Sequence, residues 1–394
     1  DKVQITLVDR LGQFYHSLGA LRGVIDQDFA SQIFIPYDRV FTPESNQSGS
    51  SNITHKFVQG SLSEVHPNHI ILEGGEKINF DYLVLATGSS YPAPAKMISR
   101  SKDEGMAIID GLRERVSAAK HILLIGGGPV GVELAAEIAE HFAEAIKSGE
   151  KKITLAHSRN LPLTDRISQR MRQDIKEKLE LLGVDLVLGH RLEVPEEVGF
   201  GDVLERRVIK SFDGSISIDS DLQIKSTGIR VNTEFMATLK PTKEGVLLVD
   251  PQSHCINVNP RLQLADPAYG HLFAPGDVNA LPDSEKNAGC AFHQGELVGK
   301  SIEKLIKAGY HRHEPGSEKA LNILEKARLG EWSVGLRPDT MIALGRKMGS
   351  LQAWKWAITG AVSNFIVSRS MGRDYKLSRA ASTLLGYKVK LNQQ

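Results

Sequence analysis

This chain of 394 residues has little cysteine, almost no net charge and no long apolar run, and each shortage excludes a class of protein. Cys255 and Cys290, its two cysteines, lie far apart, which excludes a disulfide framework, a C-x-x-C redox centre and a cysteine-rich zinc site. We therefore predict no metal site. A net charge of +1 argues against nucleic-acid binding as the main function. No run reaches the roughly 18 uncharged apolar residues of a membrane-spanning helix.

The strongest positive signal is the segment 121–137, HILLIGGGPVGVELAAE. Its apolar start predicts a buried parallel strand, and its Ala-rich end predicts a helix. Between them Gly126, Gly128 and Gly131 form a G-x-G-x-x-G at the junction of strand and helix, the context of a dinucleotide site. Gly126 allows the tight turn, Gly128 lets the backbone approach a pyrophosphate, and Gly131 lets the helix pack on the strand. The segment therefore predicts a Rossmann unit.

The sequence also repeats parts of this unit. ITLVD at 5–9 matches ITLAH at 153–157, the second strand of the Rossmann unit, and LVLATG at 83–88 matches LQIKSTG at 222–228. In the complete copy the first strand begins about 30 residues before the second. The pattern therefore predicts a first glycine-rich unit before Asp1, which this sequence does not contain. We predict an α/β fold with two Rossmann-like domains of the glutathione-reductase type, the first of them N-terminally truncated.

The end of the chain has a different composition. The predicted regions are a first nucleotide domain (1–100 with 250–310), a second one (101–249) and a basic, partly helical C-terminal region (311–394). Residues 337–394 hold ten Lys and Arg and two acids. A predicted helical stripe at i+3 and i+4 spacing consists of Leu351, Trp354, Ile358, Ala361 and Phe365. Such a helix either faces the core with a basic rim, or contacts an anionic membrane surface or an apolar substrate.

Other candidate ligand-binding residues follow predicted strands. Asp9 stands where a carboxylate would bind a ribose hydroxyl of the first dinucleotide. Small residues at the ends of the repeated strands, Thr87, Gly88 and Gly228, let the backbone pass close to a cofactor. Gly276 and Asp277 precede a helix predicted over 285–307. Asp277 there would either hold a polyol chain, with the N–H groups of the helix N-terminus offered to a phosphate, or cap the helix.

The type of pyridine nucleotide is predicted by the end of the strand at 153–157. An NAD-specific site has an acid there to bind the ribose 2′-hydroxyl, whereas an NADP site has or tolerates cations. Here the position is His157, and Arg159 follows two residues later. With no acid present, a 2′-phosphate would not be repelled, and Arg159 could pair with it. We predict that NADPH is used at least as well as NADH.

Taken together, these motifs resemble one family, the two-dinucleotide flavoprotein oxidoreductases. Within it the chain is similar to the apoptosis-inducing-factor-like proteins, in particular the ferroptosis suppressor branch (apoptosis-inducing factor 2). FYHSLGALRGVI at 14–25 resembles that branch's F-H-H-x-x-A-L-R segment, and ITLAHSR at 153–159 resembles its V-T-L-I-H-S strand. The basic tail, from GRKMG to SRAAS, resembles its membrane-related C-terminal part. The likeness covers nearly the whole chain.

The resemblance implies an FAD-dependent NAD(P)H oxidoreductase that passes electrons to a quinone such as ubiquinone at a membrane surface. It implies that Arg22 and the backbone at Leu62 touch FAD, and that Asp277 holds its ribityl or phosphate part. Lys286 would lie near the flavin and Glu133 near the nicotinamide. Two simpler roles stay open, because a first-turn glutamate such as Glu133 is favoured by the helix dipole and Lys286 could be an exposed helix lysine.

Two other functions compete with quinone reduction. The basic tail would also suit an acidic protein carrier of the ferredoxin type. The incomplete first repeat would suit a truncated product that binds a nucleotide but holds no flavin. We expect a cytoplasmic protein whose contact with a membrane, through 337–394, is peripheral.

Overall fold

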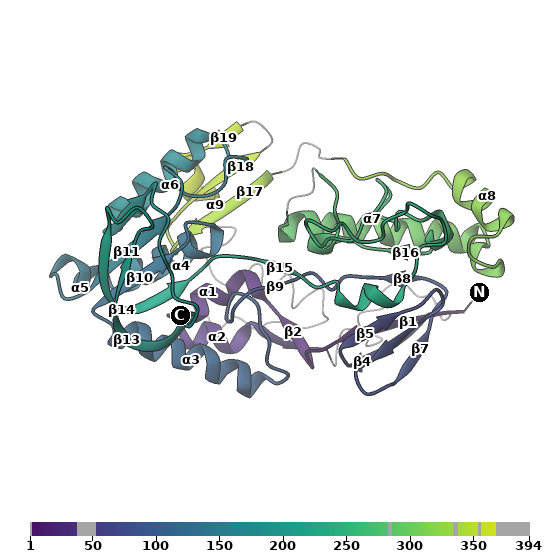
Figure 1. Cartoon of the computed structure of the whole chain (residues 1–394), viewed down its shortest axis with the longest axis horizontal. Coiled ribbons are helices and arrows are strands. Elements are labelled where there is room, and N and C mark those ends of the chain that lie inside the picture. Colours follow the sequence, from purple (N-terminus) through teal and green to yellow (C-terminus); the bar gives the residue numbers. More distant parts are fainter. Residues whose placement is uncertain (1, 38–52, 283–285, 334–337, 354–355, 368–394) are drawn as a thin grey trace.

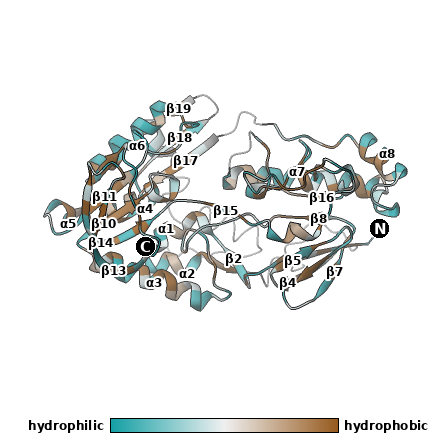
Figure 2. Ribbon diagram, viewed as in Figure 1, coloured by the Kyte–Doolittle hydropathy of each residue, from teal (hydrophilic) through white to brown (hydrophobic). Residues whose placement is uncertain are grey.

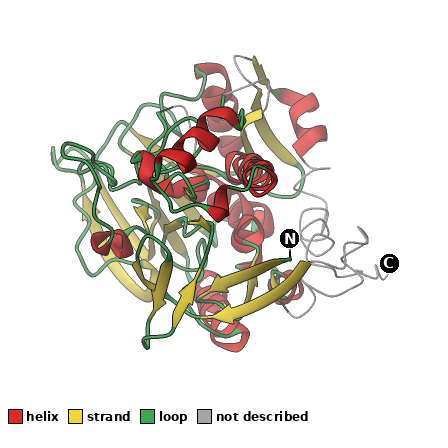
Figure 3. Ribbon diagram, turned by 90° about the vertical axis from the view of Figure 1, so that its right-hand side faces the viewer, coloured by secondary structure: helices red, strands yellow, loops and turns green. Residues whose placement is uncertain are grey.

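The structure is a computed structural model that describes residues 2–37, 53–282, 286–333, 338–353 and 356–367. The described chain forms an elongated molecule, with a five-stranded sheet towards one end and several smaller sheets towards the other (Figure 1). Helices and strands are present throughout (Figure 3), so the predicted α/β class is confirmed.

The five-stranded sheet is built around β10 (His121–Ile125). This strand pairs in parallel with β11 (Lys152–His157) on one edge and with β14 (Ser217–Lys225) on the other. Beyond these, β12 (Val184–Leu188) is parallel and β13 (Phe200–Lys210) is antiparallel. After His121, every residue of β10 is buried, as expected of a parallel strand covered on both faces. Hydrophobic residues follow these strands between the helices (Figure 2).

The helices packed on this sheet begin and end at the signals in the sequence. They include α3 (Lys102–Ala118), α4 (Pro129–His141) and α6 (Gln169–Leu181), and the short α5 (Ala143–Lys147) follows α4 with no buried residue. The predicted helices over 101–119 and 165–182 are therefore confirmed. The second begins four residues later than predicted, because the Ser168 side chain caps it by accepting a hydrogen bond from the Met171 N–H. Gly183, with a φ of +82°, follows its end.

The other region has short, separate sheets. Strand β1 (Val3–Asp9) pairs in parallel with β4 (Ile53–Gln59), and β8 (Leu83–Val84) pairs in parallel with β16 (Leu272–Phe273). Within the described residues no strand joins these two pairs into one sheet. A separate antiparallel meander is formed by β5 (Leu62–Val65), β6 (His69–Leu72) and β7 (Lys77–Asn79). The predicted first strand is confirmed, whereas the glycine-rich unit expected before it stays a prediction.

Short elements connect the two ends of the molecule. Two of them are small antiparallel pairs, β2 (Gln13–Tyr15) with β3 (Phe34–Pro36) and β9 (Ser89–Ser90) with β15 (Arg230–Val231). The helices α1 (Ala20–Gly23) and α2 (Gln27–Gln32) lie between the large sheet and the smaller ones (Figure 1). Leu21 and Val24, at α1, are buried in the same hydrophobic cluster as α4. The N-terminal part of the chain therefore packs directly on the helix that follows the glycine motif.

Helices α7 (Ala288–Lys307) and α8 (Glu318–Lys326) cover the short sheets. The first confirms the helix predicted over 285–307. Val298 and Leu305 pack with Phe273 of β16 in one cluster. No helix in the described ranges is long and apolar enough to cross a membrane.

The C-terminal region corrects one prediction. Its described part forms an antiparallel sheet, β17 (Pro338–Leu344), β18 (Met348–Ala353) and β19 (Trp356–Ile358), followed by α9 (Gly360–Val367). The helical stripe predicted from Leu351 to Phe365 is therefore wrong before Gly360. Trp354 lies outside the described residues. A short apolar run fits strand and helix periods alike, and here the turn at Gly345, with a φ of +70°, allows a hairpin.

This C-terminal sheet packs on the helices of the five-stranded sheet. Ile342 and Leu344 of β17 are buried in the cluster that contains α4 and α6. From α6, the Lys178 ammonium donates to the Gly349 carbonyl at 2.7 Å and to the Ser363 hydroxyl at 3.1 Å, and it pairs with Asp174 at 2.7 Å. The sheet therefore lies beside α6 and beside α4, the helix that begins at the glycine motif.

Candidate functional site

The glycine motif has the backbone of a pyrophosphate-binding turn. Gly126 has a φ of +117°, which L side chains rarely adopt. A Cβ on Gly131 would lie 2.0 Å from the Gly126 carbonyl oxygen, so only glycine fits there. A Cβ on Gly128 would meet nothing within 4 Å, which leaves open space beside the first turn of α4. The free N–H groups of that turn and the helix dipole favour an anion in this space. These residues fit a dinucleotide.

Two predicted residues, His157 and Arg159, lie beside this turn. The His157 Nδ1 accepts a hydrogen bond from the Gly127 N–H at 3.2 Å, and burial lowers the pKa of the imidazole. The ring is therefore neutral and supports the turn. Arg159 is about half-exposed and forms an ion pair with Asp165 at 3.6 Å. Gly228, with a φ of +82°, lies just beyond β14, two residues after Ser226, whose carbonyl closely approaches Gly126.

One face of α4 carries three glutamates, Glu133, Glu137 and Glu140, spaced so that they lie side by side. Each accepts hydrogen bonds from another segment. The Ala343 N–H of β17 donates to Glu133 at 3.2 Å. The Arg346 N–H, in the following turn, donates to Glu140 at 2.6 Å. The C-terminal hairpin is thereby attached along the helix that begins at the glycine motif.

Arg22 holds the middle glutamate. Its Nε and Nη2 donate to the Glu137 Oε1 at 3.1 and 2.7 Å, and Nη2 also donates to the Gly345 carbonyl at 3.2 Å. Both side chains of the ion pair are almost fully buried, with exposed fractions of 6% and 5%. Arg22 therefore joins α1, α4 and the C-terminal hairpin, and its contact with FAD stays a prediction. Sequence reasoning did not find Glu137, although its spacing from Glu133 was a signal.

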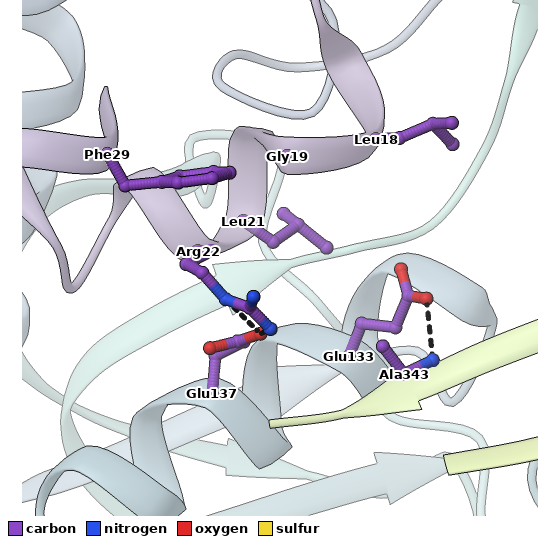
Figure 4. A pocket seen from close by; sticks show the side chains of 8 residues that line it. All are labelled: Leu18, Gly19, Leu21, Arg22, Phe29, Glu133, Glu137 and Ala343. Atoms are coloured by element: carbon purple, nitrogen blue, oxygen red, sulfur yellow. Dashed lines mark hydrogen bonds and ion pairs between the residues drawn. The ribbon is translucent and has the colours of Figure 1, made fainter. Parts of the chain in front are cut away.

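Glu133 faces a pocket between α1 and α4. Leu18, Arg22 and Phe29 line its other side, and the glutamates point towards them (Figure 4). Desolvation, with a smaller contribution from the neighbouring Glu137, raises the pKa of Glu133 to about 8, outweighing the opposing effects of the Ala343 hydrogen bond and the Arg22 charge. At neutral pH this carboxyl is mostly protonated. A protonated acid one turn from a nucleotide-binding loop can donate a hydrogen bond or a proton.

The remaining predicted residues lie at the other end of the molecule. The Asp9 carboxylate accepts hydrogen bonds from the Leu11 N–H at 2.9 Å and the Tyr37 hydroxyl at 2.6 Å. The Asp277 carboxylate accepts one from the Ser89 hydroxyl at 2.6 Å and lies 3.7 Å from the Lys96 ammonium. Both acids stand at the carboxyl ends of parallel strands, where α/β sheets bind ligands.

Some of these residues are brought together and others are not. Lys286 donates to the carbonyls of Asp277 and Asn279, so it contacts the Gly276–Asp277 turn. Gly88 precedes Ser89, which reaches the same turn. The Thr87 hydroxyl instead donates to the Asn232 carbonyl at 2.8 Å. Leu62 instead pairs with Leu72 in the meander.

These residues fit part of an FAD site. The two carboxylates at strand ends suit the hydroxyl-bearing portions of the cofactor. The sequence holds one G-x-G-x-x-G, which lies in the other domain. The described residues at this end therefore supply no second glycine turn for the FAD pyrophosphate.

Comparisons with known proteins agree with this geometry. Residues 32–295 match the sequence model of the pyridine nucleotide-disulphide oxidoreductases. The chain is 29% identical over 338 residues to apoptosis-inducing factor homolog A of Dictyostelium discoideum, covering 83% of this chain and 77% of that protein. It is 27% identical over 316 residues to human ferroptosis suppressor protein 1, covering 80% and 78%. The resemblance found in the sequence is thereby confirmed.

Solved structures share the fold. NDH2 from Plasmodium falciparum, solved in complex with NADH, superposes with a TM-score of 0.62 at 13% identity, covering 97% of this chain and 92% of that one. The sulfide:quinone oxidoreductase of Aquifex aeolicus gives a TM-score of 0.56 at 16% identity, covering 77% and 71%. At such identities the likeness shows the architecture alone, and it confirms the predicted fold class.

Proposed function

This chain belongs to the pyridine nucleotide-disulphide oxidoreductase family, and we propose that it passes electrons from NAD(P)H, through FAD, to a quinone. Membership makes it an oxidoreductase that uses a pyridine nucleotide and FAD. The name of one protein with the same fold, the sulfide:quinone oxidoreductase of Aquifex aeolicus, supports the choice of a quinone. A second one, NDH2, was solved in complex with NADH, which supports the use of that coenzyme.

The observation that carries the proposal is the junction of β10 and α4. The Gly126–Gly131 turn offers free N–H groups and open space to a pyrophosphate, and Glu133 follows within the first two turns of the same helix. A coenzyme held by this turn would extend its nicotinamide towards the pocket that Glu133 and Arg22 line. In this proposal residues 101–249 form the NAD(P)H-binding domain.

The protonated Glu133 suits the proton balance of quinone reduction. NAD(P)H, one proton and a quinone yield NAD(P)⁺ and a quinol, so the reaction consumes a proton besides the transferred hydride. Because burial keeps the Glu133 carboxyl protonated up to a pH of about 8, it can supply that proton and be reprotonated from solvent. The Ala343 N–H holds one of its oxygens, which fixes the direction in which the acid points.

The second cofactor would be held at the other end. When bound, FAD would supply the redox chemistry, taking two electrons from the nicotinamide and passing them on to the acceptor. In the proposal residues 1–100 and 250–310 form its domain, with Asp9, Asp277 and Lys286 as ligands. Lys96 pairs with the Asp277 carboxylate, whereas Lys286 contacts only carbonyls of this turn and so leaves one positive charge that suits an anionic phosphate.

We also place the acceptor site at a membrane surface. The support is compositional, since residues 337–394 carry ten Lys and Arg against two acids, and juxtaposed basic residues attract anionic lipid headgroups. The described part of this region packs against α4 and α6. Its sheet therefore connects a basic segment to the helix that carries Glu133.

The test uses the chain reconstituted with FAD and assayed for NADPH oxidation with a water-soluble short-chain quinone. We expect Glu133→Gln to lower kcat by about a hundredfold and to leave the Kd for NADPH within about twofold. The matched control is Glu144→Gln, an exposed glutamate on α5, which should behave as the unmutated protein. Reduction of a ferredoxin but no quinone would contradict the acceptor. A fully active Glu133→Gln would contradict the role of the acid.

A further inference from the structure

The loop after β11, residues 158–168, is fixed to the glycine turn. The Leu163 N–H donates to the Gly127 carbonyl at 2.7 Å, and Leu163 has a φ of +65°, a conformation that a leucine keeps only when its surroundings impose it. Arg172 of α6 donates to the carbonyls of Pro162 and Leu161 at 2.9 and 3.2 Å. The loop therefore keeps its position relative to the proposed pyrophosphate site.

This loop brings a carboxylate to the cation expected to select the coenzyme. The backbone of Arg159 is held by the Gly189 N–H, which donates to its carbonyl at 2.9 Å. Its guanidinium Nε lies 3.6 Å from the Asp165 Oδ2. The other Asp165 oxygen lies 2.6 Å from the Arg172 Nη1. One aspartate thus lies between two arginines of very different exposure, 46% for Arg159 and 10% for Arg172.

The unequal exposure of the two arginines decides which of the two Asp165 ion pairs breaks more easily. Arg172 is buried and bonded to the loop carbonyls, so it keeps Asp165 in place. Arg159 can rotate in solvent, and an exposed pair of this length is weak. His157, at the strand end itself, is neutral and donates nothing to solvent, because its Nδ1 accepts from Gly127 and its Nε2 is buried with no partner among the described residues. Arg159 is therefore the charged side chain next to the strand end that can leave its partner and bind another anion.

We propose that Asp165 is a specificity-determining residue, which occupies the guanidinium of Arg159 until the 2′-phosphate of NADPH replaces it. This inference rests on the proposed nucleotide site. With NADH, Arg159 stays paired with Asp165. With NADPH, the phosphate gains Arg159 but must approach the Asp165 carboxylate, whose charge Arg172 only partly offsets. The two effects oppose each other, so the chain accepts both coenzymes, and its affinities for NADPH and NADH differ little.

The test is equilibrium binding of adenosine 2′,5′-bisphosphate and adenosine 5′-monophosphate to the full chain, measured by titration calorimetry. The two probes differ by the 2′-phosphate, and no turnover is needed. We expect Asp165→Asn to tighten the bisphosphate by about threefold to tenfold and to change the monophosphate by less than about twofold. Arg159→Ala should weaken the bisphosphate alone, by about tenfold. In the Arg159→Ala background the gain from Asp165→Asn should shrink.

The control is Asp185→Asn in β12, which removes the same charge from an exposed pair with Lys152 and should leave the ratio of the two affinities unchanged. Equal ratios in Asp165→Asn and the unmutated protein would overturn the inference while leaving the nucleotide site intact. Loss of both probes in Asp165→Asn, with the fold preserved by circular dichroism, would show a structural role and overturn it too. If neither probe binds the unmutated chain, the nucleotide site and the inference are both wrong.

Discussion

Strands β1 and β11 carry almost the same sequence, ITLVD and ITLAH, in different surroundings. In β11, Ile153 is fully buried, because β10 and β12 flank the strand and helices cover it. The equivalent Ile5 of β1 is 45% exposed, and the only strand paired with β1 in the described chain is β4. The same contrast separates β14, buried beside β10, from β8, where Val84 is 41% exposed.

This comparison shows that the local sequence pattern is enough to form the strand. The neighbouring strands and helices decide how much burial of its side chains stabilises the protein. Full burial of an isoleucine is worth about 1.5–3 kcal/mol, and β1 obtains only part of it. The difference extends to the ligand-binding residues. The glycine turn after β10 is held open towards solvent, while the Asp9 carboxylate after β1 is occupied by Leu11 and Tyr37. The proposed ligand-binding groups are therefore open in one region and hydrogen-bonded within the protein in the other.

The largest expected effect comes from the ion pair that joins the two regions. Arg22→Met should lower the free energy of unfolding by about 3–5 kcal/mol, because it leaves the Glu137 charge buried and unpaired. Arg22→Met with Glu137→Met should recover most of the loss. The matched control is Arg206→Met, from an exposed pair with Asp219, which should cost less than about 1 kcal/mol. Urea unfolding measures all three. Equal losses in Arg22→Met and Arg206→Met would contradict the buried link.

A direct comparison of the repeats should give the next largest effect. Ile153→Ala should cost about 2–5 kcal/mol, because it leaves a cavity in a closed core. Ile5→Ala, the same change at the equivalent position, should cost less than about 1.5 kcal/mol, since this side chain is half-exposed. Both are measured by urea unfolding at one temperature. Equal costs would contradict the claim that the two equivalent isoleucines differ in how much their burial stabilises the protein.

Substitutions in the glycine turn should separate folding from binding. Gly131→Ala places a Cβ against the Gly126 carbonyl, and we expect a loss of about 1–3 kcal/mol in stability and NADPH affinity weakened at least about tenfold. Gly128→Ala meets no atom in the free protein, so its Tm should stay within about 2 °C while affinity falls similarly. Calorimetric titration with NADPH measures both variants. Unchanged affinity in Gly128→Ala would exclude the pyrophosphate from that space.

The smallest effect concerns pH. The pKa of Glu133 is raised from 4.5 to about 8 in the folded protein, so the folded state binds a proton that the unfolded state has lost. The stability contributed by the protonated acid is complete below the lower value and is lost as the pH rises to about 8. Glu133→Gln, which has no such loss, should therefore gain about 2 kcal/mol of stability relative to the unmutated protein as the pH rises from about 6 to about 7.5. A constant difference across these pH values would contradict the raised pKa.

The sequence alone predicted the elements whose signals are local. The run HILLI, the glycines at 126–131 and the Ala-rich helix predicted β10, its turn and α4, and the likeness of ITLVD to ITLAH predicted β1. Contacts between distant segments were not predictable from one sequence. Arg22 and Glu137 are 115 residues apart, and the Ala343 N–H reaches Glu133 across 210 residues. The C-terminal strands were missed for a similar reason, because pairing across a hairpin overrides a weak helical period.

The most direct test of the account is hydrogen exchange with each cofactor added alone. We propose that NAD(P)H binds at the five-stranded sheet and FAD at the β1–β4 and β8–β16 pairs. NADPH should therefore slow exchange of the amides at 127–133 and 159–165 and leave those at 9–11 and 276–279 unchanged, and FAD should do the reverse. Protection by NADPH at 276–279, or none at the glycine turn, would contradict the central claim that the turn between β10 and α4 is the NAD(P)H site.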